Sequence, residues 1–178
     1  MANIESYLKW RGDLSFSERP FCEVDNLIFS EITYFDLAGI VPSPEEGGSI
    51  SLEEASGEFF RQERKNVCAF GPHEGMLELL ARSGRFRHVR LSRFSEKIDA
   101  GRQLEFAAKT FSLEDGTDYI AFRGTGDLLT GWREDYNMSF SRVPAQDEAA
   151  AYLQKVLAET GRPAGFYTII LKKLQEGT

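Results

Sequence analysis

The stretch Asp118-Tyr119-Ile120-Ala121-Phe122 decides the fold class, because it begins a unit of strand, helix and strand. It is short and mostly apolar, as expected of a strand. Pro144 then opens a helical pattern over residues 145–159, with apolar side chains on one face. Residues 166–171 form a continuous apolar, β-branched run that is typical of a buried parallel strand. Together these segments predict one βαβ unit with a right-handed crossover.

A β-hairpin is predicted just before this unit. Residues 103–113 have an extended pattern, and Glu114-Asp115-Gly116-Thr117 supplies the turn, since Asp-Gly is a strong hairpin signal. Residues 88–94 predict a further strand, half exposed, in which apolar residues alternate imperfectly with Arg and Ser.

The N-terminal half of the chain has helical periodicity. Apolar residues at helical spacing predict helices over residues 3–10, 23–37 and 74–81. Ser51 with Glu54 three residues later has the spacing of a capping box, which predicts another helix ending near Arg64. The sequence therefore predicts a single α/β domain over residues 1–178, with a helical N-terminal half, a β-hairpin and one βαβ unit.

Length, charge and cysteine content limit the class of protein and the compartment in which it is expected. The chain has 178 residues and a net charge of -7, which argues against a general nucleic-acid binder. Cys22 and Cys68 are interpreted as free thiols, most simply small buried hydrophobes, in a reducing compartment. We find no signal peptide and no apolar run of membrane-spanning length, so a cytoplasmic protein without a transmembrane segment is expected.

Two charged features have competing interpretations. The two histidines, His73 and His88, lie in no metal-binding motif, and neither a metal nor a cofactor is expected. A basic cluster could form a local patch for anions or lipid headgroups. A solvated face, partly neutralised by the many carboxylates, is the favoured interpretation of this cluster, which comprises Arg82, Arg85, Arg87, Arg90, Arg93 and Lys97.

The strand at residues 118–122 runs into a motif with a family resemblance. The sequence Tyr-Ile-Ala-Phe-Arg-Gly-Thr at 119–125, followed by Gly-Trp-Arg-Glu-Asp at 131–135, resembles the class 3 lipases. In that family an apolar strand ends in Phe-Arg-Gly-Ser/Thr, and a Trp and an Asp follow. Residues 7–14 and 24–27 look like a narrower group, the uncharacterised bacterial lipase-like α/β hydrolases called Mbeg-like, and this similarity extends from Met1 to about Pro163.

The resemblance implies a partial α/β-hydrolase fold and, for the family, hydrolysis of a lipid or ester by a serine nucleophile. It places Thr125 at the oxyanion hole, and Gly124 and Trp132 against the substrate. It also implies a supporting role for Arg123, with Asp135 as its candidate partner. Each position has a simpler interpretation: Thr125 as a turn residue, and Trp132 as an aromatic that packs a loop onto the sheet.

The sequence departs from the family at the nucleophile. Such enzymes carry Ser in a Gly-x-Ser-x-Gly turn after the next strand, but residues 172–178 read Lys-Lys-Leu-Gln-Glu-Gly-Thr. Without that Ser, covalent catalysis has no attacking atom. We therefore expect a truncated family member that is catalytically inactive by itself. The alternatives are a non-enzymatic interaction module and one half of a split hydrolase completed by a partner chain.

The same reasoning predicts self-association. The strand at residues 166–171 would lie at an edge of an incomplete sheet, without the helix that normally covers it. Leaving a helix face of apolar surface in water costs several kcal/mol at about 25 cal/mol per Å². Dimerisation, a swapped strand or aggregation is expected from this edge.

Overall fold

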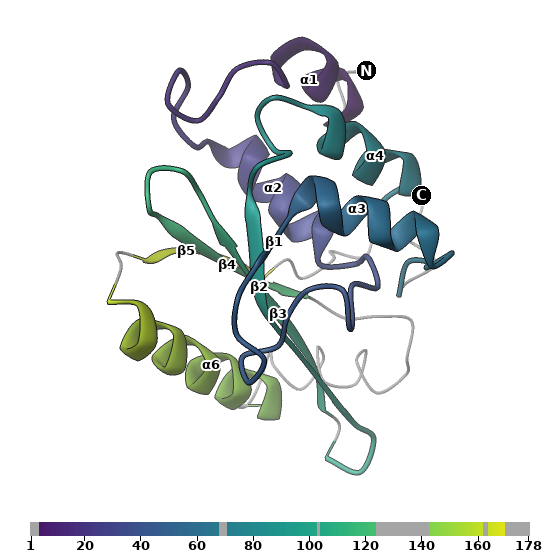
Figure 1. The fold of residues 1–178 in the computed structure, drawn as a ribbon. Coiled ribbons are helices and arrows are strands. Elements are labelled where there is room, and N and C mark those ends of the chain that lie inside the picture. The colour runs from purple at the N-terminus through teal and green to yellow at the C-terminus, as the bar shows by residue number, and fades with distance from the viewer. Residues whose placement is uncertain (1–3, 68–70, 103, 124–142, 162–163, 170–178) are drawn as a thin grey trace, which may run out of the picture.

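A five-stranded mixed sheet lies at the centre of the part of the chain that the computed structural model describes, residues 4–67, 71–102, 104–123, 143–161 and 164–169 (Figure 1). The strands neighbour one another in chain order. The elements are α1 (Ile4–Arg11), α2 (Glu23–Ile32), β1 (Ile50–Ser51), α3 (Leu52–Arg61), α4 (Glu74–Arg82), β2 (Arg90–Asp99), β3 (Leu104–Ser112), β4 (Asp118–Arg123), α6 (Pro144–Thr160) and β5 (Ala164–Ile169). The predicted mixed α/β class is confirmed.

The strand–helix–strand unit forms as the sequence predicts. Strands β1 to β4 are antiparallel to their neighbours, whereas β5 is parallel to β4, with α6 between them in the chain. Pro144 occupies the first turn of α6. β5 begins at Ala164, two residues before the predicted start, and pairs there with Asp118. Within the described ranges β5 is an edge strand.

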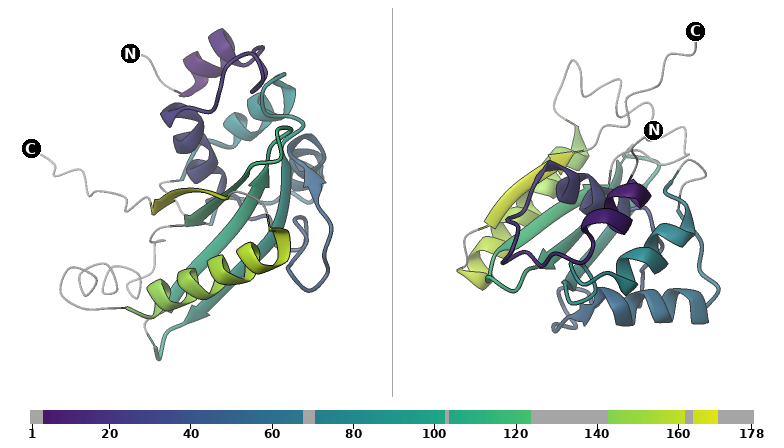
Figure 2. Two further views of the ribbon diagram at one scale, coloured as in Figure 1. Left: turned by 90° about the vertical axis from the view of Figure 1, so that its left-hand side faces the viewer. Right: turned by 90° about the horizontal axis from the view of Figure 1, so that it is seen from above.

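The sheet is covered on both faces. Figure 2 shows α6 lying along one face, while the N-terminal helices gather over the other. Successive side chains of β3 point to opposite faces of the sheet. Phe106 and Ala108 pack with Tyr152 of α6 on one face. On the opposite face the ring of Phe111 stacks on Phe29 of α2, with centroids 4.5 Å apart. This central strand is therefore buried on both sides, as its near-continuous apolar pattern requires.

Local signals fix several helix starts. The predicted capping box of α3 is present: Ser51 Oγ accepts from the Glu54 backbone N–H at 3.2 Å, and the Glu54 carboxylate accepts from the Ser51 backbone N–H at 2.9 Å. His73 is the N-cap of α4, and its ring nitrogen Nδ1 accepts from the Gly75 backbone N–H at 3.0 Å. None of the helices in the described ranges combines the length and apolarity that crossing a bilayer requires.

The sheet contains one more hairpin than the sequence predicts. The expected turn between β3 and β4 is confirmed, and Gly116 adopts a φ of +85° there. β2, however, runs on to Asp99 and pairs with β3 over its whole length. The register shifts between Ser92 and Ser95, and Arg93 has a φ of +52°. This bulge breaks the alternation from which the strand was predicted to end at residue 94.

Helix α2 is shorter than predicted: it ends at Ile32 rather than at residue 37. A lysine from the central strand binds the backbone at this end of the helix. Lys109 Nζ donates to the carbonyl oxygens of Ile32, Thr33 and Phe35 at 3.3, 3.1 and 3.0 Å. A helix end leaves carbonyls without intrahelical partners, and here the buried amino group of a lysine binds them.

Arg85 is buried rather than part of a solvated face, which corrects the sequence interpretation. Its side chain is 1% exposed, and that of Asp25 is 0% exposed. Arg85 Nε and Nη2 donate to the two carboxylate oxygens of Asp25 at 2.8 and 2.6 Å. The remaining donor contacts go to the backbone carbonyls of Leu14, Ser15, Arg19 and Pro20. The solvated-face interpretation does hold for other members of the cluster, since Arg82, Arg87, Arg90 and Lys97 are exposed.

Cys22 is also placed differently from the prediction. It is a free thiol, as expected, but it is exposed at the N-cap of α2 rather than buried. Its sulfur lies 3.7 Å from the Tyr7 hydroxyl. Cys68 lies outside the described residues.

We predict that Arg85→Met lowers the free energy of unfolding by about 3–5 kcal/mol, because it leaves the Asp25 carboxylate buried without its cation. Urea unfolding followed by circular dichroism measures the loss. The matched control is Arg82→Met, whose side chain is 76% exposed in a pair with Glu78. This control should cost less than about 1 kcal/mol. An equal effect of the two substitutions would contradict the role of Arg85.

Candidate functional site

The candidate site begins at the C-terminal end of β4, where the chain continues into the predicted oxyanion turn. Arg123 is the last residue of that strand. Gly124, Thr125, Trp132 and Asp135 lie outside the described residues, and their roles stay predictions.

Arg123 is buried between two acidic side chains of the sheet. Its side chain is 4% exposed, and Nη1 lies 2.8 Å from Glu96 Oε1 of β2. Nη2 lies 3.7 Å from Glu105 Oε1 of β3. The register explains the geometry: Arg123 pairs with Ala107, and Ala107 pairs with Glu96. The small alanine between them leaves room for the arginine to cross β3.

Lys109 lies on the same face of the sheet as Arg123, Glu96 and Glu105. These four side chains are called the charged row below. Burial, together with the nearby charge of Arg123, lowers the pKa of Lys109 to about 7, although Glu96 and Asp36 oppose the shift. The face of the sheet toward the N-terminal helices thus changes along its length. It is apolar at Phe111 and charged toward the end of β4.

These groups position the backbone rather than perform chemistry. The three carbonyls around Lys109 Nζ occupy its hydrogen-bonding positions, so this amine is a structural donor. Arg123, held by Glu96 and Glu105, fixes the end of β4 from within the sheet. The charged row therefore fixes the position of Arg123, the last residue of β4.

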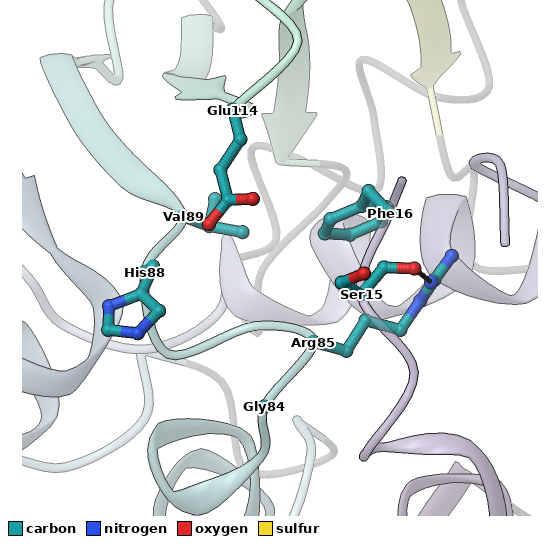
Figure 3. Close-up of a pocket in the computed structure, with 7 residues that line it drawn as sticks. All are labelled: Ser15, Phe16, Gly84, Arg85, His88, Val89 and Glu114. Carbon is teal, nitrogen blue, oxygen red and sulfur yellow. Dashed lines mark hydrogen bonds between the residues drawn. The ribbon is translucent and has the colours of Figure 1, made fainter. Parts of the chain in front are cut away.

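A serine, a histidine and an acid also line a small pocket away from the row (Figure 3). Ser15 Oγ donates to Glu18 at 2.7 Å, and His88 Nε2 accepts from Arg87 Nε at 2.9 Å. The His88 ring points away from Ser15 in Figure 3. The pocket, with Glu114 at its edge, has a volume of about 10 Å³, which is room for one water molecule. Ser15, His88 and Glu114 therefore do not form a nucleophile–base–acid arrangement.

The described residues also show no arrangement typical of a metal site or of a serine activated by histidine. Among the residues that the structure describes, no three His, Cys, Asp or Glu side chains are grouped as metal ligands would be. In the same ranges no hydrogen bond joins a histidine to a serine hydroxyl: His73 binds the Gly75 backbone, and His88 binds Arg87.

The described residues define a mixed α/β protein: an antiparallel meander extended by one parallel strand, with a fixed arginine at the end of β4. The chain belongs to the Mbeg1-like family, whose model matches residues 80–168. The match covers the end of α4 through β5, and the expected resemblance of the residues before it stays a prediction. No curated protein and no solved structure matches the chain.

Sequence reasoning identified Arg123 but missed Glu96, Glu105 and Lys109. A usable signal was present in β3, where Glu105 and Lys109 interrupt an otherwise apolar strand. Charges at such positions are buried only when they are paired or hydrogen-bonded, so they mark a site that other elements must complete.

We predict that Lys109→Met removes a pH dependence from stability. The folded pKa is about 7, whereas an unfolded lysine titrates near ~10.4. Between these values the unfolded state binds more protons, so the stability conferred by Lys109 rises with pH and is lost as pH falls toward 7. Relative to Lys109→Met, the wild-type free energy of unfolding should rise by up to ~1.4 kcal/mol per pH unit.

Urea unfolding of both chains between about pH 7 and about pH 9 measures this difference. Lys97→Met, at an exposed lysine of the neighbouring strand, is the control and should track the wild type. If the wild-type and Lys109→Met profiles were parallel, the titration of Lys109 in this window would be refuted.

We also predict that Arg123→Met destabilises the chain by about 3 kcal/mol, because the Glu105 carboxylate, whose side chain is 5% exposed, then loses its guanidinium partner. Adding Glu105→Gln to Arg123→Met should recover part of the loss, since one buried negative charge is removed. Denaturant unfolding of the two single variants and the double variant gives the coupling. Strictly additive effects would show that Arg123 and Glu105 do not interact.

Proposed function

We propose that this chain carries the oxyanion-side scaffold of a lipase-like acyl hydrolase and that, by itself, it does not hydrolyse esters. The observation that carries the proposal is the end of β4, where a buried arginine in a Phe-Arg-Gly-Thr sequence is held by Glu96 and Glu105.

The chemistry of acyl transfer assigns the parts. A tetrahedral intermediate needs donors aimed at its oxyanion, one of them from the loop before the nucleophile strand. The backbone N–H and hydroxyl of Thr125 are the proposed donors, and Gly124 allows a close approach to the substrate. The substrate class would be a lipid or another ester.

Two further features support this assignment. β4, α6 and β5 form the parallel unit that in such a hydrolase connects the oxyanion strand to the nucleophile strand. Arg123 is anchored by the sheet, so the end of β4 is held in place without a bound substrate. The missing part is the nucleophile: no Gly-x-Ser-x-Gly occurs in the 178 residues. The attacking oxygen and its base are therefore not supplied by that motif here.

The proposal predicts no ester hydrolysis above background by the purified chain. Short-chain p-nitrophenyl esters are the substrates, and Thr125→Ala is the matched variant, expected to give the same background rate. A fluorophosphonate that labels activated serines should leave the mass of the chain unchanged. Turnover that Thr125→Ala abolishes, together with a phosphonate adduct on a serine, would overturn the inactive assignment.

The alternatives can be separated by reading the coding sequence that follows codon 178. A Gly-x-Ser-x-Gly sequence encoded there, in any frame, would favour a hydrolase that is interrupted or split between chains. Co-expression of that segment with this chain should then produce esterase activity that Thr125→Ala removes. An interaction module predicts neither result.

A further inference from the structure

A pocket of about 400 Å³ lies between α1, the segment that follows it and the start of α2. This region stands at the top of Figure 1, on the side of the molecule remote from α6. Its volume falls within the range of about 300–1,000 Å³ that is typical of small-molecule sites. No part of the proposed hydrolase assignment uses this pocket.

The walls of the pocket are mainly apolar and aromatic. Tyr7, Trp10, Leu14, Pro20 and Val24 contribute to them. Trp10 is 71% exposed, a large apolar side chain left in water at the rim. An exposed aromatic beside a concave apolar surface is the arrangement from which ligand and partner sites are commonly built.

The pocket is formed before any ligand arrives. One wall belongs to the segment between α1 and α2, and Arg85 binds the backbone carbonyls of Leu14, Arg19 and Pro20 in that segment. The Tyr7 hydroxyl donates to Asp25 at 3.1 Å, and burial raises the pKa of Tyr7, so this donor stays protonated. Walls fixed in this way need little ordering when a ligand binds.

The charge at the pocket is positive. The ionisable side chains among its described lining include Arg11, Arg19 and Arg85 and no carboxylate. The charge of Arg85 is matched by Asp25, which leaves Arg11 and Arg19 to set the field at the rim. The Arg11 guanidinium carbon lies 4.2 Å from the ring centroid of Trp10, so charge and aromatic surface are presented together.

We infer that this pocket binds a small aromatic anion, a ring system bearing one carboxylate or sulfonate, with the ring against Trp10 and the acid at Arg11. A flat ring suits Trp10 and Tyr7 better than a flexible acyl chain, because it loses little conformational freedom on stacking. An arginine at the rim binds an acid by charge-assisted hydrogen bonds.

The test uses 8-anilinonaphthalene-1-sulfonate as the probe and N-phenyl-1-naphthylamine as its uncharged analogue. The sulfonate should bind saturably to the folded full chain, with a rise in probe fluorescence. Arg11→Gln should weaken that binding by about tenfold. It should leave binding of the uncharged analogue unchanged. Lys9→Gln is the matched control, because Lys9 is an exposed cation of the same helix that does not line the pocket.

Two further measurements locate the probe. Trp10→Ala should abolish sulfonate binding, while circular dichroism shows that the variant is folded. Cys22 lines the same pocket and is exposed, so bound sulfonate should slow its alkylation by iodoacetamide, followed by peptide mass mapping. Absence of binding, binding that leaves Cys22 unprotected, or equal effects of Arg11→Gln and Lys9→Gln would each overturn the inference.

Discussion

Arg85 and Asp25 form a buried ion pair to which several separate parts of the chain are attached. The arginine lies between α4 and β2, the aspartate lies in the first turn of α2, and the four carbonyls that complete the site belong to the segment before α2. The guanidinium also lies 4.0 Å from the ring centroid of Phe16. A buried charge is tolerated only when its partners are in place, so the pair requires these segments to dock together. The N-terminal helices are thus placed on the sheet by polar as well as apolar contacts.

The same principle operates in the charged row beneath those helices. Lys109 binds the end of α2, and Arg123 joins three adjacent strands through Glu96 and Glu105. Among the residues that the structure describes, the buried basic side chains are Arg85, Lys109 and Arg123, and all three lie in the family-matched residues 80–168. Asp25 and the carbonyls of Ile32, Thr33 and Phe35, which bind two of them, precede that segment. For Arg85 and Lys109 the matched segment therefore supplies donors whose partners precede it in the chain, whereas Arg123 is bound by Glu96 and Glu105 within it. The residues that precede the family match therefore have a structural role, because they bind the side chains of Arg85 and Lys109.

Local signals in the sequence were sufficient where a few neighbouring residues decide the structure. The capping box at Ser51, the Asp-Gly turn before β4 and the helix that begins at Pro144 all form as predicted. Predictions failed where a distant residue decides. α2 ends earlier than predicted, at the point where Lys109, 77 positions away from Ile32, binds the carbonyls of Ile32, Thr33 and Phe35. Arg85 is buried because of an acid 60 positions earlier, and no periodicity carries that information.

For the candidate site, the motif located Arg123 but could not supply its partners, because Glu96 and Glu105 reach it through strand register rather than sequence proximity. That route has a functional consequence. Both acids belong to the sheet, so the end of β4 is held by interactions that do not involve a substrate or a nucleophile. The folded sheet requires Arg123 whether or not the proposed oxyanion turn takes part in catalysis. The sheet itself therefore accounts for the burial of Arg123, and the presence of Phe-Arg-Gly-Thr alone is no measure of activity.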